Sequence, residues 1–163
     1  MHRASEIGRL VLGTVADRRW RSLPAVPESV AQARRFTEGV LAEVAATDAD
    51  HLDDVVLVVS ELITNAVREV ARMKRAQDDG RPVHLGLAVR PRWTHISAVD
   101  TAPDLPRETG HGPLPISGRG IPIIRHLAAM TWVERADEHK TIHVVVARTG
   151  VELTPEEGKS LKP

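Results

Sequence analysis

The feature that most restricts the possible folds is a long amphipathic segment, residues 52–72. At about 100° per residue, a helix over this segment separates apolar from polar side chains. One face collects Leu52, Val55, Val56, Val59, Ile63, Ala66 and Val70, and the other collects Asp54, Glu61, Asn65, Arg68, Glu69 and Arg72. Asp50 is the expected N-cap. Because the apolar face must be covered, the chain needs a second layer of structure.

The remaining segments supply that layer. Residues 28–45 repeat apolar side chains at helical spacing, and residues 121–130 form a short apolar helix after Gly120. Alternating patterns predict strands over residues 20–23, 83–89, 94–99, 132–135 and 141–147. Residues 101–117 form a long proline- and glycine-rich loop of the kind that often serves as a lid. The order predicts an α+β fold: a two-layer α/β sandwich with helices on one face of a mixed, mostly antiparallel sheet.

Composition narrows the class of protein. The 163 residues are 42% hydrophobic, which suits one domain with a sizeable core. Lys+Arg and Asp+Glu are both 22, so no bulk charge favours nucleic acid or an anionic membrane. There is no Cys, and the eight His show no metal-ligand spacing, so a zinc site is not expected. No apolar run reaches membrane-spanning length and residues 1–20 lack a signal-peptide core, so we expect a cytoplasmic protein.

Glu61 and Asn65 lie one helical turn apart on the polar face of the 52–72 segment. Taken alone, such a pair most often marks a solvated helix face. In a pocket, however, an Asn oxygen can be a neutral ligand for Mg²⁺, and a Glu one turn earlier can deprotonate a hydroxyl or a water. The pair is therefore a candidate site.

Asp100 ends the apolar strand that begins near Thr94. An Asp at this position often does no more than start a turn. Its carboxylate can also accept a hydrogen bond from an exocyclic amino group, which would select adenine over guanine.

Gly118-Arg119-Gly120 leads directly into the 121–130 helix. Two glycines often mark only a turn. At a helix start they can instead leave free backbone N–H groups for an anion, and Arg119 can add a charge-assisted contact to phosphate. Pro122 suits the first helical turn, where no N–H is needed.

Taken in order, these segments resemble the ATPase domain of the GHKL superfamily, which includes histidine kinases and gyrase. The resemblance is closer to the small anti-sigma-factor serine kinases and the short actinobacterial ATP-binding proteins similar to them. Residues 58–68 (VVSELITNAVR) resemble the N box, residues 99–103 (VDTAP) the G1 region and residues 117–121 (SGRGI) the G2 box. Trp132 and Lys140-Thr141 resemble the closing strands.

The resemblance implies a role for each matching residue. Asn65 would bind Mg²⁺, Glu61 would be the catalytic general base, and Asp100 would read the adenine amino group. The phosphates would be lined by Gly118, Arg119 and Gly120. Thr141, on the last strand, would sit near adenine. The implied cofactors are ATP and Mg²⁺.

The resemblance covers roughly Trp20 to Ala147. It divides the chain into an N-terminal arm (1–19), an ATP-binding domain (20–148) and a flexible polar tail (149–163). The chain departs from its relatives at Glu69, where they usually carry His, at His139, where many carry Gly, and at Pro122.

The implied function is regulatory. The protein would phosphorylate Ser or Thr of an anti-anti-sigma-type antagonist protein, sequester a sigma factor, or both. The alternative is a nucleotide-gated protein-binding module with weak or no catalysis. Relatives are often homodimers, and no direct contact with nucleic acid or membrane is expected.

Overall fold

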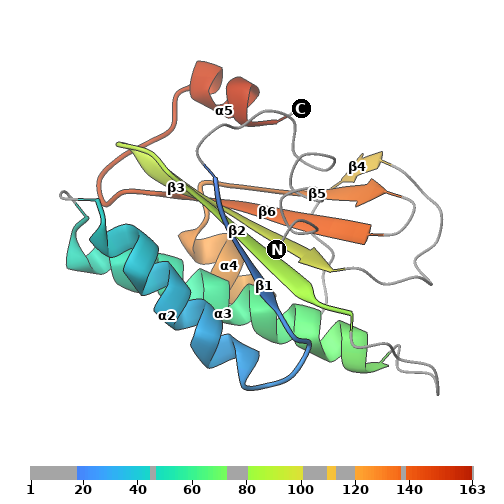
Figure 1. Ribbon diagram of the computed structural model, residues 1–163. Coiled ribbons are helices and arrows are strands. Elements are labelled where there is room, and N and C mark those ends of the chain that lie inside the picture. Colours follow the sequence, from blue (N-terminus) through green and yellow to red (C-terminus); the bar gives the residue numbers. More distant parts are fainter. Residues whose placement is uncertain are drawn as a thin grey trace.

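The computed structural model describes residues 18–44, 47–72, 81–100, 110–112, 120–136 and 139–162. The elements from β1 to β6 follow the order that the sequence pattern predicts, with the short strand β4 added (Figure 1). Their bounds are β1 (Arg19–Leu23), α2 (Ser29–Ala42), α3 (Ala49–Arg72), β2 (Val83–Val89), β3 (Trp93–Asp100), β4 (Gly110–Gly112), α4 (Gly120–Leu127), β5 (Met130–Ala136), β6 (His139–Ala147) and α5 (Pro155–Leu161).

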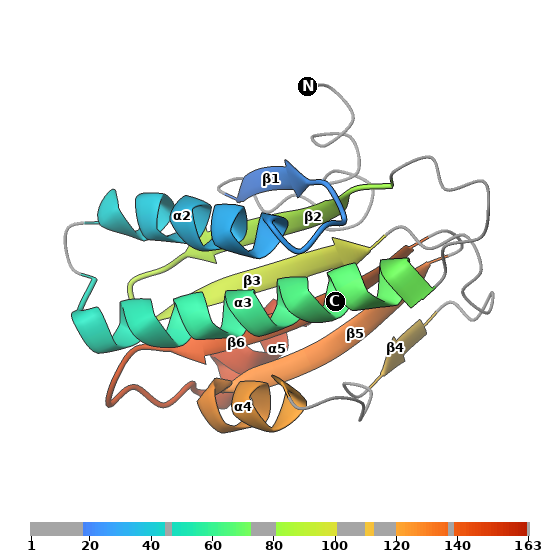
Figure 2. The same ribbon diagram turned by 90° about the horizontal axis from the view of Figure 1, so that it is seen from below.

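The strands of the described part form one sheet in the order β1-β2-β3-β6-β5-β4. Each strand pair in it is antiparallel, and β3 and β6 are neighbours although β4, α4 and β5 separate them in the chain. Helices α2, α3 and α4 cover one face of the sheet, and α5 lies on the opposite side (Figures 1 and 2). The α+β prediction, with helices on one face of a mostly antiparallel sheet, is confirmed.

The core lies between the helices and the sheet. Side chains in a strand alternate between faces, so β3 turns Ile96 and Ala98 toward the helices, where they join the apolar face of α3. Across the sheet and α3, the buried cluster includes Leu62, Ile63, Leu85, Leu87, Val133, Val144 and Val146. On the outer face, a Cβ at Gly86 would come within 2.8 Å of the Trp20 ring, so glycine at this position makes room for that indole.

The start of α3 differs from the prediction. The helix begins at Ala49, and the carboxylate of Asp48 accepts a hydrogen bond from the N–H of His51 at 2.7 Å. Asp48 is therefore the N-cap, because its side chain reaches the third helical N–H, and Asp50 lies inside the first turn. His51 then reaches the sheet, with Nε2 at 2.9 Å from Oγ1 of Thr94.

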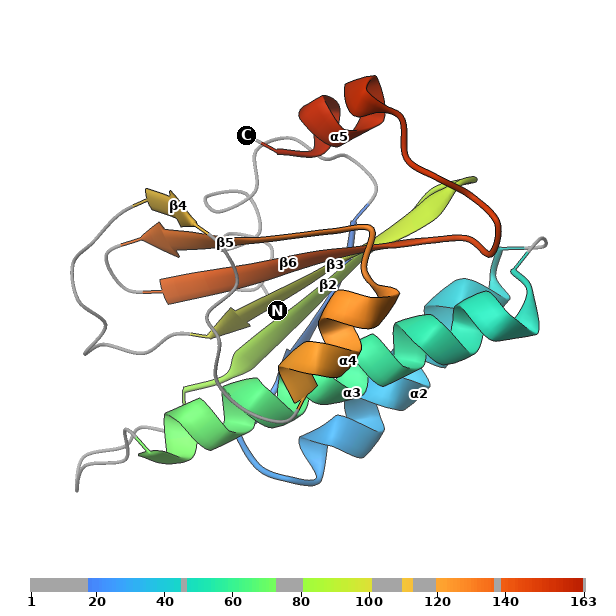
Figure 3. The ribbon, with the colours of Figure 1, turned by 180° about the vertical axis from the view of Figure 1, so that it is seen from behind.

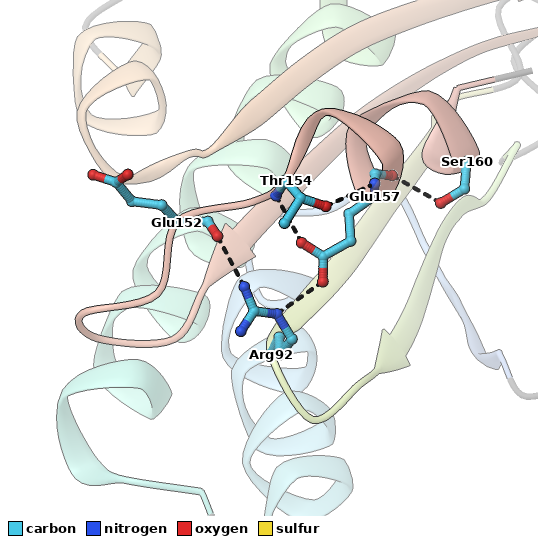
Figure 4. A network of polar contacts seen from close by, with 5 residues as sticks. All are labelled: Arg92, Glu152, Thr154, Glu157 and Ser160. Carbon is cyan, nitrogen blue, oxygen red and sulfur yellow. Dashed lines mark hydrogen bonds and ion pairs between the residues drawn. The ribbon is translucent and has the colours of Figure 1, made fainter.

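The polar tail contains a helix that the sequence analysis did not predict. In α5, Thr154 and Glu157 form a capping box: each side chain bonds the backbone N–H of the other residue, and Pro155 occupies the first turn (Figure 4). Arg92, in the turn between β2 and β3, binds Glu157 through Nε at 2.8 Å and the carbonyl of Glu152 through Nη2 at 2.9 Å. These contacts anchor the helix to the sheet.

Two of the predicted segments, the N-terminal arm and the 101–117 loop, lie largely outside the described residues. Residues 1–17 of the predicted arm lie outside the described residues, and β1 starts at Arg19. Most of the predicted 101–117 loop also lies outside them, apart from the three residues of β4. None of the helices in the described part combines the length and apolar character needed to cross a membrane.

Candidate functional site

A polar stripe runs along α3. Glu61, Asn65 and Glu69 follow one another at four-residue intervals, and all three are partly buried. Leu62 beside them is buried in the core, whereas Arg68 is exposed. The stripe therefore lies at the border between the core face and the solvent face of α3. The prediction that Glu61 and Asn65 point away from the core needs this correction.

The far end of the stripe is joined to the sheet by Lys140. This side chain leaves β6 toward the helices, is only 4% exposed, and its ammonium donates a hydrogen bond to the carboxylate of Glu69. The same Nζ atom lies 3.5 Å from Oδ2 of Asp100, which stands directly opposite Lys140 at the end of β3. The stripe and Asp100 consequently share the helix-covered side of the sheet.

Asp100 has an unusual electrostatic environment. It is 4% exposed, and burial raises the pKa of its carboxyl to about 7; the neighbouring Lys140 ammonium lowers that pKa and the Glu69 carboxylate raises it. Its Oδ1 atom is buried and finds no hydrogen-bond partner among the residues that the structure describes. An unsatisfied buried acceptor costs about 1–3 kcal/mol. The arrangement is thus suited to a donor group brought by a ligand.

Thr141 is not brought to Asp100. Its cross-strand neighbours are Val99 on β3 and Glu134 on β5, and all three side chains face away from the helices because strand side chains alternate. Thr141 is fully buried there. On β6, the residue that faces Asp100 is Lys140.

The predicted phosphate-binding segment is described only in part. Gly118 and Arg119 lie outside the described residues, and Gly120 is the first residue of α4. Pro122 falls in the first turn of that helix, where the missing N–H costs nothing. Helix α4 packs beside α3 on the helix-covered side of the sheet (Figure 3). The start of α4 is therefore on the face that carries the polar stripe.

A second polar cluster occupies the opposite face of the sheet. Nη2 of Arg18 lies 2.9 Å from Nδ1 of His95, and Nε2 of His95 lies 3.0 Å from Nδ1 of His143. Arginine only donates, and burial lowers the pKa of Arg18 only to about 10, so this side chain stays charged at neutral pH. Each imidazole therefore accepts at Nδ1 and carries its proton on Nε2, and Nε2 of His143 lies 3.2 Å from Oε2 of Glu134.

This chain of contacts, Arg18–His95–His143–Glu134, is reinforced from the side. Ser97 accepts a hydrogen bond from Arg18, and its Oγ lies 3.1 Å from Nδ1 of His143. The indole of Trp132 stacks on the His143 ring at a centroid distance of 4.6 Å. The members of the cluster are buried or partly buried and bond to one another, as in a network that stabilises the sheet. No group of three or more His, Asp or Glu side chains in the described ranges is arranged to hold a metal ion.

Sequence reasoning missed Lys140 as a member of the site. Its signal was nevertheless present, because Lys140, Ile142, Val144 and Val146 alternate in β6, and the last three are the apolar residues expected to face the core. A lysine in that row has to find carboxylate partners. Glu69, singled out as a departure from the relatives, is one of them.

The comparisons with known proteins agree with the fold. The family model of the histidine kinase-like ATPase domain matches residues 23–146, from the end of β1 to the end of β6. The chain belongs to this family. No curated protein matches it. The matched segment contains the polar stripe, Asp100 and Lys140, so the candidate site lies within the family domain.

Proposed function

We propose that the protein binds ATP with Mg²⁺ and acts in the cytoplasm as an anti-sigma-type regulator. It transfers the γ-phosphoryl group to Ser or Thr of an antagonist protein, holds a sigma factor in an inactive complex, or does both. The observation that carries the nucleotide part is the buried Oδ1 atom of Asp100, which has no partner in the described residues, inside a histidine kinase-like ATPase domain.

Adenine suits that oxygen. Its exocyclic amino group donates a hydrogen bond to a carboxylate, whereas guanine presents an oxygen at the corresponding position, which a carboxylate repels. Asp100 is held in place by its strand and by Lys140, so the acceptor is positioned before a ligand arrives.

The stripe on α3 supplies the other groups. Asn65 would hold Mg²⁺ through its carboxamide oxygen, and the ion would offset the negative charge of the phosphate oxygens. Glu61, one turn earlier, would accept the proton of the attacking Ser or Thr hydroxyl. Both side chains are partly buried, which keeps them close to the helix-covered side of the sheet without closing them off from a ligand.

A second candidate function is nucleotide-gated protein binding without phosphoryl transfer. The observation that favours it concerns Glu69, which stands where relatives usually carry His. Its carboxylate is committed to Lys140 at the end of the sheet. A position that carries His in the relatives is therefore occupied here by a residue with a structural partner.

One experiment separates the two functions. The protein is immobilised with MgATP, co-purifying proteins are identified by mass spectrometry, and each is then incubated with the protein and γ-labelled ATP. The kinase function predicts label on Ser or Thr of a partner. A partner retained only with MgATP, but never labelled, supports the gated module. Failure of the purified protein to bind MgATP by calorimetry would rule out both.

A further inference from the structure

We infer that Lys140 is a positioning residue for base selection at this site: its ammonium, shared between Glu69 and Asp100, favours the charged form of the Asp100 carboxyl, which accepts adenine and rejects guanine. The inference rests on the proposed nucleotide binding and adds to it two residues, Lys140 and Glu69, that select the base through Asp100.

The geometry divides the two oxygens of Asp100 between two tasks. Lys140 approaches Oδ2, at 3.5 Å, and leaves Oδ1 without a partner in the described part of the chain. Glu69 fixes the ammonium from the α3 side, and Arg135 is the residue opposite Lys140 on β5. On the other side of Asp100, its neighbour in β2 is the apolar Val83. Lys140 is thus a cation in contact with the base-reading carboxylate.

The protonation state of Asp100 decides which purine fits. An ionised carboxylate only accepts, so it pairs with the adenine amino group and repels the guanine oxygen. A protonated carboxyl can donate to the guanine oxygen instead, and the discrimination between the two bases is lost. Whatever changes the charge of Asp100 therefore changes the preference for ATP over GTP.

Lys140 and Glu69 act on that charge in opposite directions. Burial raises the pKa of Asp100 to about 7, the Lys140 ammonium lowers it, and the Glu69 carboxylate raises it. Replacing Lys140 by Met should therefore move the titration of Asp100 to higher pH. Replacing Glu69 by Gln should move it to lower pH, because one negative neighbour is removed.

The first test needs no nucleotide. Carboxyl ¹³C NMR follows the titration of Asp100 in the full-length protein, in Lys140→Met and in Glu69→Gln. The expected result is an upward shift of the midpoint in Lys140→Met and a downward shift in Glu69→Gln. Unchanged midpoints, or shifts in the same direction, would overturn the inference while leaving nucleotide binding untouched.

The second test measures base selection. Calorimetry with MgATP and MgGTP is run at a series of pH values around the Asp100 midpoint. The ratio of ATP to GTP affinity should rise with pH by up to about tenfold per unit below the midpoint and then level off. This rise should occur at higher pH in Lys140→Met and at lower pH in Glu69→Gln. A wild type that binds ATP with a ratio that the two variants do not shift would contradict the inference.

Control variants separate these effects from general changes. Lys159→Met and Glu156→Gln make the same charge changes on α5, on the opposite side of the sheet, and should leave the midpoint where it is. Lys140→Arg keeps a cation between Glu69 and Asp100 and should restore a pH profile near that of the wild type. If Lys140→Met fails to fold, Glu69→Gln still tests the direction of the shift. A wild type that binds neither nucleotide would refute the proposed function itself, and the NMR titration would still judge the role of Lys140.

Discussion

Two buried imidazoles, His95 on β3 and His143 on β6, lie on the outer face of the sheet with Nε2 and Nδ1 3.0 Å apart. Arg18 sets the direction of this contact, because the guanidinium can only donate to Nδ1 of His95. Protonating Nδ1 of His95 would place a second donor against Arg18. The His95 ring therefore has to remain neutral in the folded protein.

This relationship predicts a loss of stability in acid. Burial lowers the pKa of His95 to about 2, from 6.5 in an unperturbed chain. Between these values the unfolded chain binds a proton that the folded chain does not, so the free energy of unfolding falls with falling pH, by about 1.4 kcal/mol per unit. Urea denaturation of His95→Gln should show a shallower loss than the wild type below about pH 6.5.

Asp100 changes the free energy of unfolding with pH in the opposite direction to His95. Its pKa is raised to about 7, so its stabilising contribution is fully present below the ordinary value of 3.8 and is lost as pH rises toward 7. The same denaturation series on Asp100→Asn should therefore show a steeper loss in acid than the wild type. Equal slopes in the wild type, His95→Gln and Asp100→Asn would contradict both assignments.

Helix α5 depends on its capping box. A seven-residue helix is unstable alone, and Thr154→Ala removes the side-chain acceptor for the N–H of Glu157, which typically costs about 1 kcal/mol. Hydrogen exchange of the α5 amides should accelerate several-fold, while the amides of α3 keep their rates. Glu156→Gln, an exposed change in the same first turn, serves as the control. Unchanged exchange in α5 would show that the contacts of Arg92 suffice to hold the helix.

Glu61 and Asn65 lie in the same polar stripe, but substitutions at the two positions should have different effects on nucleotide binding and phosphoryl transfer. Asn65→Ala removes the proposed Mg²⁺ ligand, so the affinity for ATP should lose its dependence on Mg²⁺ in calorimetry. Glu61→Ala removes a base and no ligand, so binding should survive while phosphoryl transfer to a partner falls by about 10²–10⁴-fold. Arg68→Ala, an exposed change on the same helix, should alter neither. If Glu61→Ala and Asn65→Ala behave alike in both assays, the assigned roles are wrong.

The sequence predicts a structural feature well where that feature depends on a single helix or strand. The period of α3 predicted its buried face, and the alternation in β3 and β6 predicted those strands within a few residues. The helix α5 was also predictable, since Thr154-Pro155-Glu156-Glu157 is a capping-box sequence with Pro in the first turn. The sequence analysis predicted no helix in this segment because the tail is polar.

The rest depended on pairing between distant segments. Whether Lys140 or Thr141 faces Asp100 is decided by the register of β6 on β3, and a shift of one residue exchanges the two. The contacts between His95 and His143 depend on the same register. Asp48 rather than Asp50 caps α3 because the helix starts at Ala49, earlier than the predicted start at Leu52, and side-chain periodicity does not specify where a helix starts.

The central claim, that Asp100 reads the base of an adenine nucleotide, is tested most directly by calorimetry with MgATP and MgGTP at about pH 8, one unit above the Asp100 midpoint. The wild type should bind MgATP more tightly than MgGTP. Asp100→Asn should lose about 1–3 kcal/mol of ATP binding, because the buried acceptor is weakened, and with it most of the discrimination. Asp53→Asn, an exposed change at the start of α3, should match the wild type. Equal affinities of the wild type for the two nucleotides, or full ATP binding by Asp100→Asn, would contradict the claim.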